Sequence, residues 1–142
     1  MRSVRSGVGA EPRECDLDEI RRWVTEAAQA ASAKGGDDTV VLEVGDLLGI
    51  TDSFVISSGT NRRQVLTMAD EVEARVRAVG GPSPLRVEGR EDAHWILLDY
   101  GDFVVHVFLD ETRRFYDLER LWADAPRSYP EALANGVRAA GN

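Results

Sequence analysis

The stretch that decides the fold is Trp95-Ile96-Leu97-Leu98-Asp99-Tyr100-Gly101-Asp102-Phe103-Val104-Val105-His106-Val107-Phe108-Leu109. Its apolar residues flank a polar centre, and the glycine there offers the positive φ that a tight hairpin turn needs. We predict two antiparallel strands joined by a two-residue loop, Tyr100-Gly101. In that register Asp99 faces Asp102, Leu97 faces Val104 and Trp95 faces His106.

Alternation along the two strands sorts their side chains onto two faces of the hairpin. One face is apolar throughout and is predicted to be core: Ile96, Leu98, Phe103, Val105, Val107 and Leu109. The other face combines large apolar groups with carboxylates: Trp95, Leu97, Asp99, Asp102, Val104, His106 and Phe108. Because interface hot spots are enriched in tryptophan, this second face is interpreted as a docking surface for a basic partner. The alternative is that a helix of the same chain covers it.

Length and composition indicate one globular domain. A chain of 142 residues with 43% hydrophobic and 30% charged residues can build a core without disulfides. The net charge of −8 argues against a protein whose main role is to bind a phosphate backbone. It suits a basic protein partner or simply solubility, and charge alone favours solubility. The single Cys15 excludes an internal disulfide and favours a reducing, cytoplasmic location. We expect no membrane span and no secretory signal.

The remaining pattern predicts the order α-β-β-α-β-β-β in one α/β domain with a mixed sheet flanked by helices. A flexible arm over residues 1–15 precedes a helix capped by Asp16, whose apolar stripe is Leu17, Ile20, Val24, Ala27, Ala28 and Ala31. Strands are expected at 40–44, 54–58 and 85–87, with the hairpin after them. The domain covers residues 16–125 and ends in a short helix capped by Asp117, and residues 126–142 are predicted to be a disordered tail.

A second helix is predicted to begin at Asn61. Asn61 can cap it and Gln64 can complete a capping box, after which one apolar stripe follows: Val65, Met68, Ala69, Val72, Val76 and Val79. The preceding Gly59-Thr60 could instead bind an anion through free amides at the helix N-terminus. The sequence lacks a P-loop and a dinucleotide fingerprint, which favours the turn and cap over a nucleotide site.

Candidate metal and catalytic residues do not converge in this reading. Asp99 and Asp102 could meet across the turn, but Asp110 and Glu111 follow the far end of the second strand. His94 and His106 would point to opposite faces of the hairpin, so packing of His106 against Trp95 is the simpler account. We therefore predict no metal, no cofactor and no catalytic residue. The run Arg113-Arg114-Phe115-Tyr116 lies among acidic residues and is interpreted as an ion-paired surface rather than an RNA-binding patch.

Three segments resemble the ribosomal silencing factor (Iojap) family: residues 52–65, residues 87–89 together with 95–108, and residues 111–122. The second carries W-x-x-x-D-x-G-D-x-x-V-H from Trp95 to His106, and the third carries R-x-x-Y-x-L-E-x-L-W from Arg113 to Trp122. The similarity runs in order from about Leu17 to Trp122.

This resemblance implies a nucleotidyltransferase-like topology without catalytic carboxylates. It implies binding to the large ribosomal subunit through large-subunit ribosomal protein fourteen, a basic protein on the face that meets the small subunit. Subunit joining would be blocked and translation lowered under nutrient limitation. The family also implies a homodimer when free, with no membrane and no sequence-specific nucleic acid as partner.

By similarity, the partner surface is assigned to two groups of residues: Trp95, Leu97, Asp99, Tyr100 and Asp102, and then Arg114, Tyr116 and Trp122. The strand pattern independently supports the assignment of the first group, with the exception of Tyr100. The assignment of Tyr100 depends on its expected exposed position in the turn. The alternative function is a nucleotide-binding enzyme of the nucleotidyltransferase type. It would use Gly59 and Thr60 for phosphates and the two aspartates for a divalent ion.

Overall fold

A computed structural model describes residues 13–45 and 51–130. In chain order its elements are α1 (Arg13–Ala33), β1 (Asp37–Glu43), β2 (Ser53–Gly59), α3 (Arg62–Ala78), β3 (Arg86–Glu88), β4 (Trp95–Asp99), β5 (Phe103–Leu109), α4 (Asp110–Tyr116), α5 (Leu118–Leu121) and β6 (Arg127–Ser128). The strands form one six-stranded sheet in the order β3-β4-β5-β2-β1-β6. β2 and β5 are parallel and the other neighbours are antiparallel, so the sheet is mixed.

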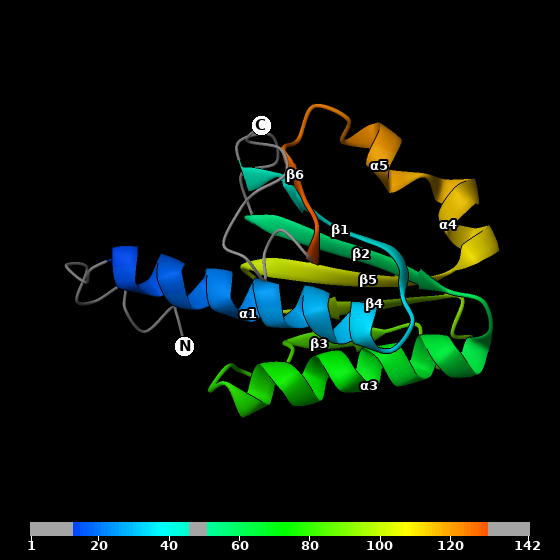
Figure 1. The fold of residues 1–142 in the computed structure, drawn as a ribbon, viewed down its shortest axis with the longest axis horizontal. Coiled ribbons are helices and arrows are strands. Elements are labelled where there is room, and N and C mark those ends of the chain that lie inside the picture. The colour runs from blue at the N-terminus through cyan, green and yellow to red at the C-terminus, as the bar shows by residue number, and fades with distance from the viewer. Residues whose placement is uncertain (1–12, 46–50, 131–142) are drawn as a thin grey trace.

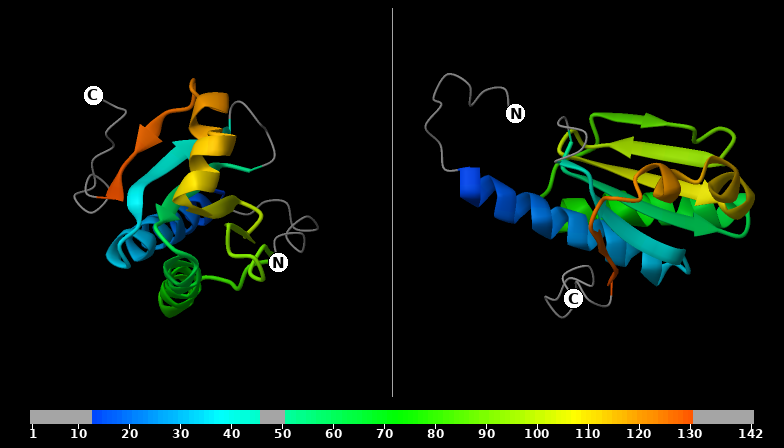
Figure 2. Two further views of the ribbon diagram at one scale, coloured as in Figure 1. Left: turned by 90° about the vertical axis from the view of Figure 1, so that its right-hand side faces the viewer. Right: turned by 90° about the horizontal axis from the view of Figure 1, so that it is seen from above.

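Helices lie on both faces of this sheet. α1 and α3 run side by side across one face, the inner face, while α4 and α5 lie over the opposite, outer face (Figure 1, Figure 2). The predicted α/β class with a mixed, helix-flanked sheet is confirmed. The sequence did not predict α4 or β6.

The two long helices bury the apolar stripes that define them. From α1 the buried residues of the predicted stripe are Ile20, Val24, Ala27, Ala28 and Ala31, and from α3 they are Val65, Met68, Ala69, Val72 and Val76. Both stripes join one core with the inner-face residues of β4 and β5. The alanines of α1 lack long side chains, so α1 and α3 can approach each other closely. α1 begins at Arg13, so Asp16 lies within the helix and the prediction that it caps the helix is wrong.

Asn61 caps α3 as predicted. Its side-chain oxygen accepts the Gln64 N–H at 2.9 Å. Gln64 accepts the N–H of Thr60 at 2.7 Å, and its amide nitrogen donates to the carbonyls of Lys34 at 3.1 Å and Gly35 at 3.0 Å. Gln64 therefore ties the start of α3 to the end of α1. The Thr60 amide, a candidate for anion binding, is used inside the protein.

The hairpin forms, but its turn lies one residue later than predicted. Tyr100 N–H donates to the Phe103 carbonyl at 2.9 Å, so the loop is Gly101-Asp102. The Asp99 carboxylate accepts the Gly101 N–H at 2.8 Å, and Gly101 takes a φ of +86°. This side-chain bond fixes where the turn starts. In the observed register Trp95 lies opposite Phe108, Leu97 opposite His106 and Asp99 opposite Val104. Since side chains alternate with a period of two, each one still points to its predicted face.

The first and last elements of the described chain also differ from prediction. β6 pairs with β1, and Glu43 N–H donates to the Pro126 carbonyl at 2.9 Å, so the prediction of a disordered tail is wrong for residues 126–130. The predicted flexible arm is likewise wrong for residues 13–15, which belong to α1. Residues 1–12 and 131–142 lie outside the described part of the chain. Within that part, none of the helices has the length and apolarity needed to cross a bilayer.

Candidate docking surface on the outer face

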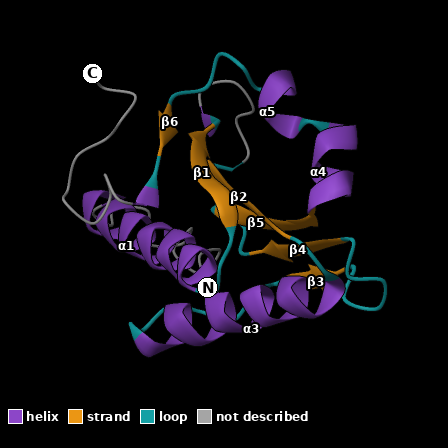
Figure 3. Cartoon of the chain, turned by 45° about the vertical axis from the view of Figure 1, so that its right-hand side comes forward, coloured by secondary structure: helices purple, strands orange, loops and turns teal. Residues whose placement is uncertain are grey.

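The outer side of β3 and β4 carries the side chains expected to meet a partner. Register places Arg86 beside Asp99 and Glu88 beside Leu97, all on the outer face. We call these four residues the β3–β4 surface. Arg86 and Glu88 are exposed, while Leu97 and Asp99 are half-buried. Figure 3 shows β3 and β4 at one edge of the sheet beside α3, which packs on their inner side, while α5 lies over the strands toward the other edge.

Asp99 is held in one orientation by two contacts. One of its oxygens accepts the Gly101 N–H, and the other lies 3.5 Å from Nη2 of Arg86. Arg86 also lies 3.8 Å from the Glu88 carboxylate, so one arginine serves two acids and the surface keeps a net negative charge. This arrangement suits a positively charged neighbour.

The predicted pairing of Asp99 with Asp102 is wrong. Asp102 lies in the loop, where its carbonyl accepts the Asp52 N–H at 2.8 Å, while Asp99 faces Val104. The cause is the later turn, which moves Asp102 out of the strand. The β3–β4 surface therefore contains Asp99 without a carboxylate directly opposite on β5.

Trp95 forms the border between this surface and α4. Its ring centroid lies 4.8 Å from that of Phe108 beneath and 4.8 Å from that of Tyr116 above. Its indole N–H donates to Nδ1 of His106 at 3.1 Å. The predicted contact between Trp95 and His106 is confirmed, although the two residues are diagonal rather than opposite. Trp95 is half-buried and held on three sides.

His106 is a packed residue of the sheet. Burial lowers its pKa from 6.5 to about 4, so the ring is neutral at pH 7. Since Nδ1 accepts the indole proton, Nε2 carries the ring proton, and no acceptor for it occurs among the described residues. Phe54 packs edge-on against the ring at 4.8 Å. His94, by contrast, is exposed and precedes β4.

Tyr100 does not belong to the surface. Because the turn starts one residue later, Tyr100 pairs with Phe103 and points to the inner face, where only 5% of it is exposed. Its ring stacks on Phe103 with centroids 4.5 Å apart, and burial raises its pKa. The prediction of an exposed turn position for Tyr100 is wrong.

The second group of predicted residues comes from α4, α5 and the residue after α5. Arg114 and Tyr116 are exposed, and Trp122 is half-buried with its ring edge-on to Phe54 at 5.9 Å. The contact between Tyr116 and Trp95 makes this group continuous with the β3–β4 surface. Two further apolar residues, Phe115 at 79% exposure and Leu121 at 70%, stand on the same segment and were not predicted. Their place within the family-like segment was the available signal.

Acidic residues do not gather into a metal site. In residues 13–45 and 51–130 no three side chains of His, Cys, Asp or Glu come together to hold an ion. Asp110 and Glu111 begin α4, at the opposite end of β5 from Asp102. The surface can therefore bind through shape, apolar area and charge.

Residues 17–141 match the family model described as ribosomal silencing factor during starvation. The chain belongs to the ribosomal silencing factor family. It is 40% identical over 100 residues to ribosomal silencing factor RsfS of Halalkalibacterium halodurans, an alignment that covers 70% of this chain and 85% of that protein. A crystal structure of a Chromobacterium violaceum protein is similar with a TM-score of 0.69 and 32% identity, and covers 73% of this chain and 86% of that one.

A mouse relative, mitochondrial assembly of ribosomal large subunit protein 1, is 34% identical over 99 residues, which cover 68% of this chain and 42% of that protein. The family resemblance seen in the sequence is thus confirmed. Family membership assigns the protein to ribosome-associated regulation of translation. The nucleotidyltransferase-like topology stays a prediction.

Proposed function

We propose that this silencing factor binds the large ribosomal subunit through large-subunit ribosomal protein fourteen and sterically blocks joining of the small subunit. Translation would fall under nutrient limitation because fewer subunits join. The name of the mouse relative, which refers to the large subunit, supports this choice of subunit. In the same proposal the free protein is a cytoplasmic homodimer.

The observation that carries the proposal is the partly open outer face. α4 and α5 cover only part of that face, and the β3–β4 surface lies beyond them. Leu97 offers apolar area next to Trp95 and Tyr116, whose rings contact each other at a tilt of 49° and are both partly exposed. A well-packed aromatic anchor contributes about 2 kcal/mol or more to binding.

Charge supports a basic partner. Glu88 and Asp99 share one arginine, and the whole chain carries a net charge of −8. Acidic groups at the rim of an interface raise the association rate with a basic protein and fix its orientation. Blocking by occupancy needs no catalytic group, because the bound protein itself fills the space required by the small subunit.

The test is a pelleting assay with separated ribosomal subunits. Leu97→Glu introduces a charge at the apolar centre, and Asp99→Asn removes a charge while keeping an oxygen for the Gly101 N–H. We expect each variant to bind large subunits at least about tenfold more weakly, the effect of losing about 1.4 kcal/mol. Thr67→Glu, on the exposed side of α3, is the matched control and should bind normally.

A second readout completes the design. Light scattering of mixed subunits should show slower joining with the wild-type protein and with Thr67→Glu, and normal joining with Leu97→Glu. Normal large-subunit binding by folded Leu97→Glu and Asp99→Asn would refute the assignment of this surface.

A further inference from the structure

We propose that the ion pair between Arg113 and Glu119 is a positioning pair. It fixes the α4–α5 segment, residues 110–122, on the outer face and so places the aromatic half of the docking surface. This inference rests on the proposed function for its consequence in binding, but its structural part can be tested without ribosomes.

The α4–α5 segment is held to the sheet in an unusual way. The buried residue of α4 is a charged one, Arg113, and α5 has no buried residue. Leu118 and Trp122 are only partly buried against the core beneath them. Short helices are normally held in place by burial of an apolar face. α4 and α5 bury little apolar surface, so apolar burial stabilises their position only weakly. A second kind of attachment is therefore needed.

Arg113 provides that attachment. Its Nε and Nη2 both donate to Oε2 of Glu119, at 3.1 Å and 2.6 Å. Nη1 donates to the Ser58 hydroxyl at 3.0 Å, and Nη2 donates to the Asp38 carbonyl at 2.7 Å. The guanidinium of Arg113 thus connects α4 with α5, with the end of β2 and with the start of β1. The side chains of Arg113 and Glu119 are 10% and 20% exposed, so solvent screens this pair little.

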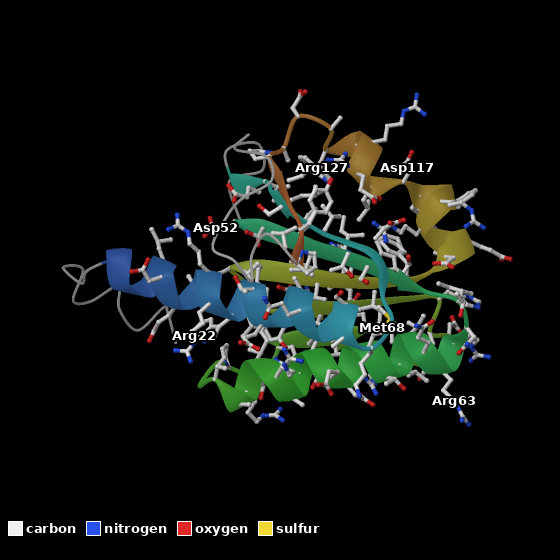
Figure 4. All side chains as sticks on the ribbon, in the orientation of Figure 1. Arg22, Asp52, Arg63, Met68, Asp117 and Arg127 are labelled. Atoms are coloured by element: carbon white, nitrogen blue, oxygen red, sulfur yellow. The ribbon has the colours of Figure 1, made fainter. Side chains whose placement is uncertain are left out.

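The pair also spans the bend between the two helices. Asp117 separates α4 from α5 with φ 50° and ψ 56°, a left-handed conformation that residues other than glycine seldom adopt (Figure 4). Arg113 and Glu119 lie on either side of this residue. Arg127 of β6 also donates to the Glu119 carbonyl at 3.2 Å. Together these bonds set the angle at which α5 leaves α4.

The attachment of α4 and the bend at Asp117 together decide where the aromatic residues lie. Tyr116 of α4 contacts Trp95 only while α4 stays close to the sheet, and Trp122 after α5 contacts Phe54 only while the segment also stays bent at Asp117. Without the pair, we expect the segment to loosen and to carry Phe115, Tyr116 and Leu121 away from the β3–β4 surface. Arg113 and Glu119 need not touch the partner for this effect.

Hydrogen exchange measured by mass spectrometry tests the structural part. Arg113→Lys keeps the charge but loses the planar fork, and Glu119→Gln keeps the shape but loses the charge. Both should speed exchange in residues 110–122 by at least about tenfold and leave α3 unchanged. Each change leaves the partner's shielded charge poorly paired, which destabilises the attached segment. Combining the two changes should loosen the segment no further than the more severe single change. Arg21→Lys is the control, because its pair with Asp18 is 71% and 82% exposed.

Pelleting with large subunits tests the consequence. Arg113→Lys and Glu119→Gln should weaken binding by at least about tenfold while thermal unfolding stays cooperative. Unchanged exchange in residues 110–122 overturns the positioning role itself. Faster exchange with normal binding, in an assay where Leu97→Glu fails to bind, overturns its importance for docking alone. If Leu97→Glu also binds normally, the proposed docking surface is wrong, and so is the proposed effect of the Arg113–Glu119 pair on docking. Glu119→Gln keeps the test valid if Arg113→Lys does not fold.

Discussion

The indole N–H of Trp95 donates a hydrogen bond to Nδ1 of His106, across a diagonal of the β4–β5 hairpin, at 3.1 Å. This bond joins a half-exposed residue of the proposed surface to a buried residue of the sheet. It fixes the histidine as a neutral acceptor and fixes the tryptophan ring between Phe108 and Tyr116.

The first prediction concerns pH. Burial lowers the pKa of His106 to about 4 from 6.5, so between these values the unfolded chain binds a proton that the folded chain does not. The free energy of unfolding should therefore fall as pH drops below 6.5, and this contribution should level off below pH 4. The shift corresponds to about 3 kcal/mol. Urea unfolding at pH 7, 5.5 and 4 measures it. In His106→Asn, which keeps an acceptor for the indole, this part of the pH dependence should vanish; an unchanged slope contradicts the assignment.

The second prediction concerns the indole donor. Trp95→Phe keeps an aromatic ring between Phe108 and Tyr116 but leaves Nδ1 of His106 buried without a donor. Stability should fall by about 1–2 kcal/mol in urea unfolding at pH 7. Tyr116→Phe, which keeps the ring that packs on Trp95, serves as the control and should unfold like the wild type. Equal stability of Trp95→Phe and Tyr116→Phe would show that the bond contributes nothing.

The third prediction separates Tyr100 from the surface. Its hydroxyl is buried and has no hydrogen-bond partner among the described residues. Tyr100→Phe removes this unsatisfied group, so stability should stay within about 0.5 kcal/mol of the wild type or rise. Binding to large subunits should not change, because the ring lies on the inner face. A clear loss of binding with normal stability would contradict this prediction and show that Tyr100 contributes to the interface.

The fourth prediction concerns Gln64. Gln64→Ala removes the bonds to Thr60, Lys34 and Gly35 that connect α3 with α1. We expect a loss of about 1–2 kcal/mol in thermal or urea unfolding, with faster hydrogen exchange at the end of α1. Asn61→Ser, which keeps a capping oxygen, should cost much less. Similar stabilities for the two variants would mean that the link between the helices is unimportant.

The sequence allowed prediction of elements whose residues carry a strong local pattern. The period of two placed every side chain of β4 and β5 on its correct face, and the cap and stripe located α3. The register was wrong because a single side-chain bond, from Gly101 N–H to Asp99, decides where the turn begins. Alternation alone cannot distinguish two registers that differ by two residues. Because of the same error, Tyr100 was predicted to lie on the docking surface, although it lies on the inner face.

α4 could not be predicted from hydropathy. Its buried residue is Arg113, and a charged residue is buried only when partners exist for it. Those partners, Ser58, Asp38 and Glu119, come from three other parts of the chain. The sequence did indicate ion pairing around Arg113, and the pair with Glu119 confirms that part, but Arg113 is buried rather than on the surface. Which acid pairs with which arginine depended on the fold.

The parallel pairing of β2 with β5 has a consequence for biogenesis. Ser53 pairs with Phe103 and Gly59 with Leu109, so the middle of the sheet joins two segments that α3, β3 and β4 separate in the chain. Such distant contacts slow folding, because a long loop must close before they form. During synthesis the nascent chain cannot complete its central strands until Leu109 has left the ribosome. The central strand pair of each new copy therefore forms late, after 109 of its 142 residues have been synthesised.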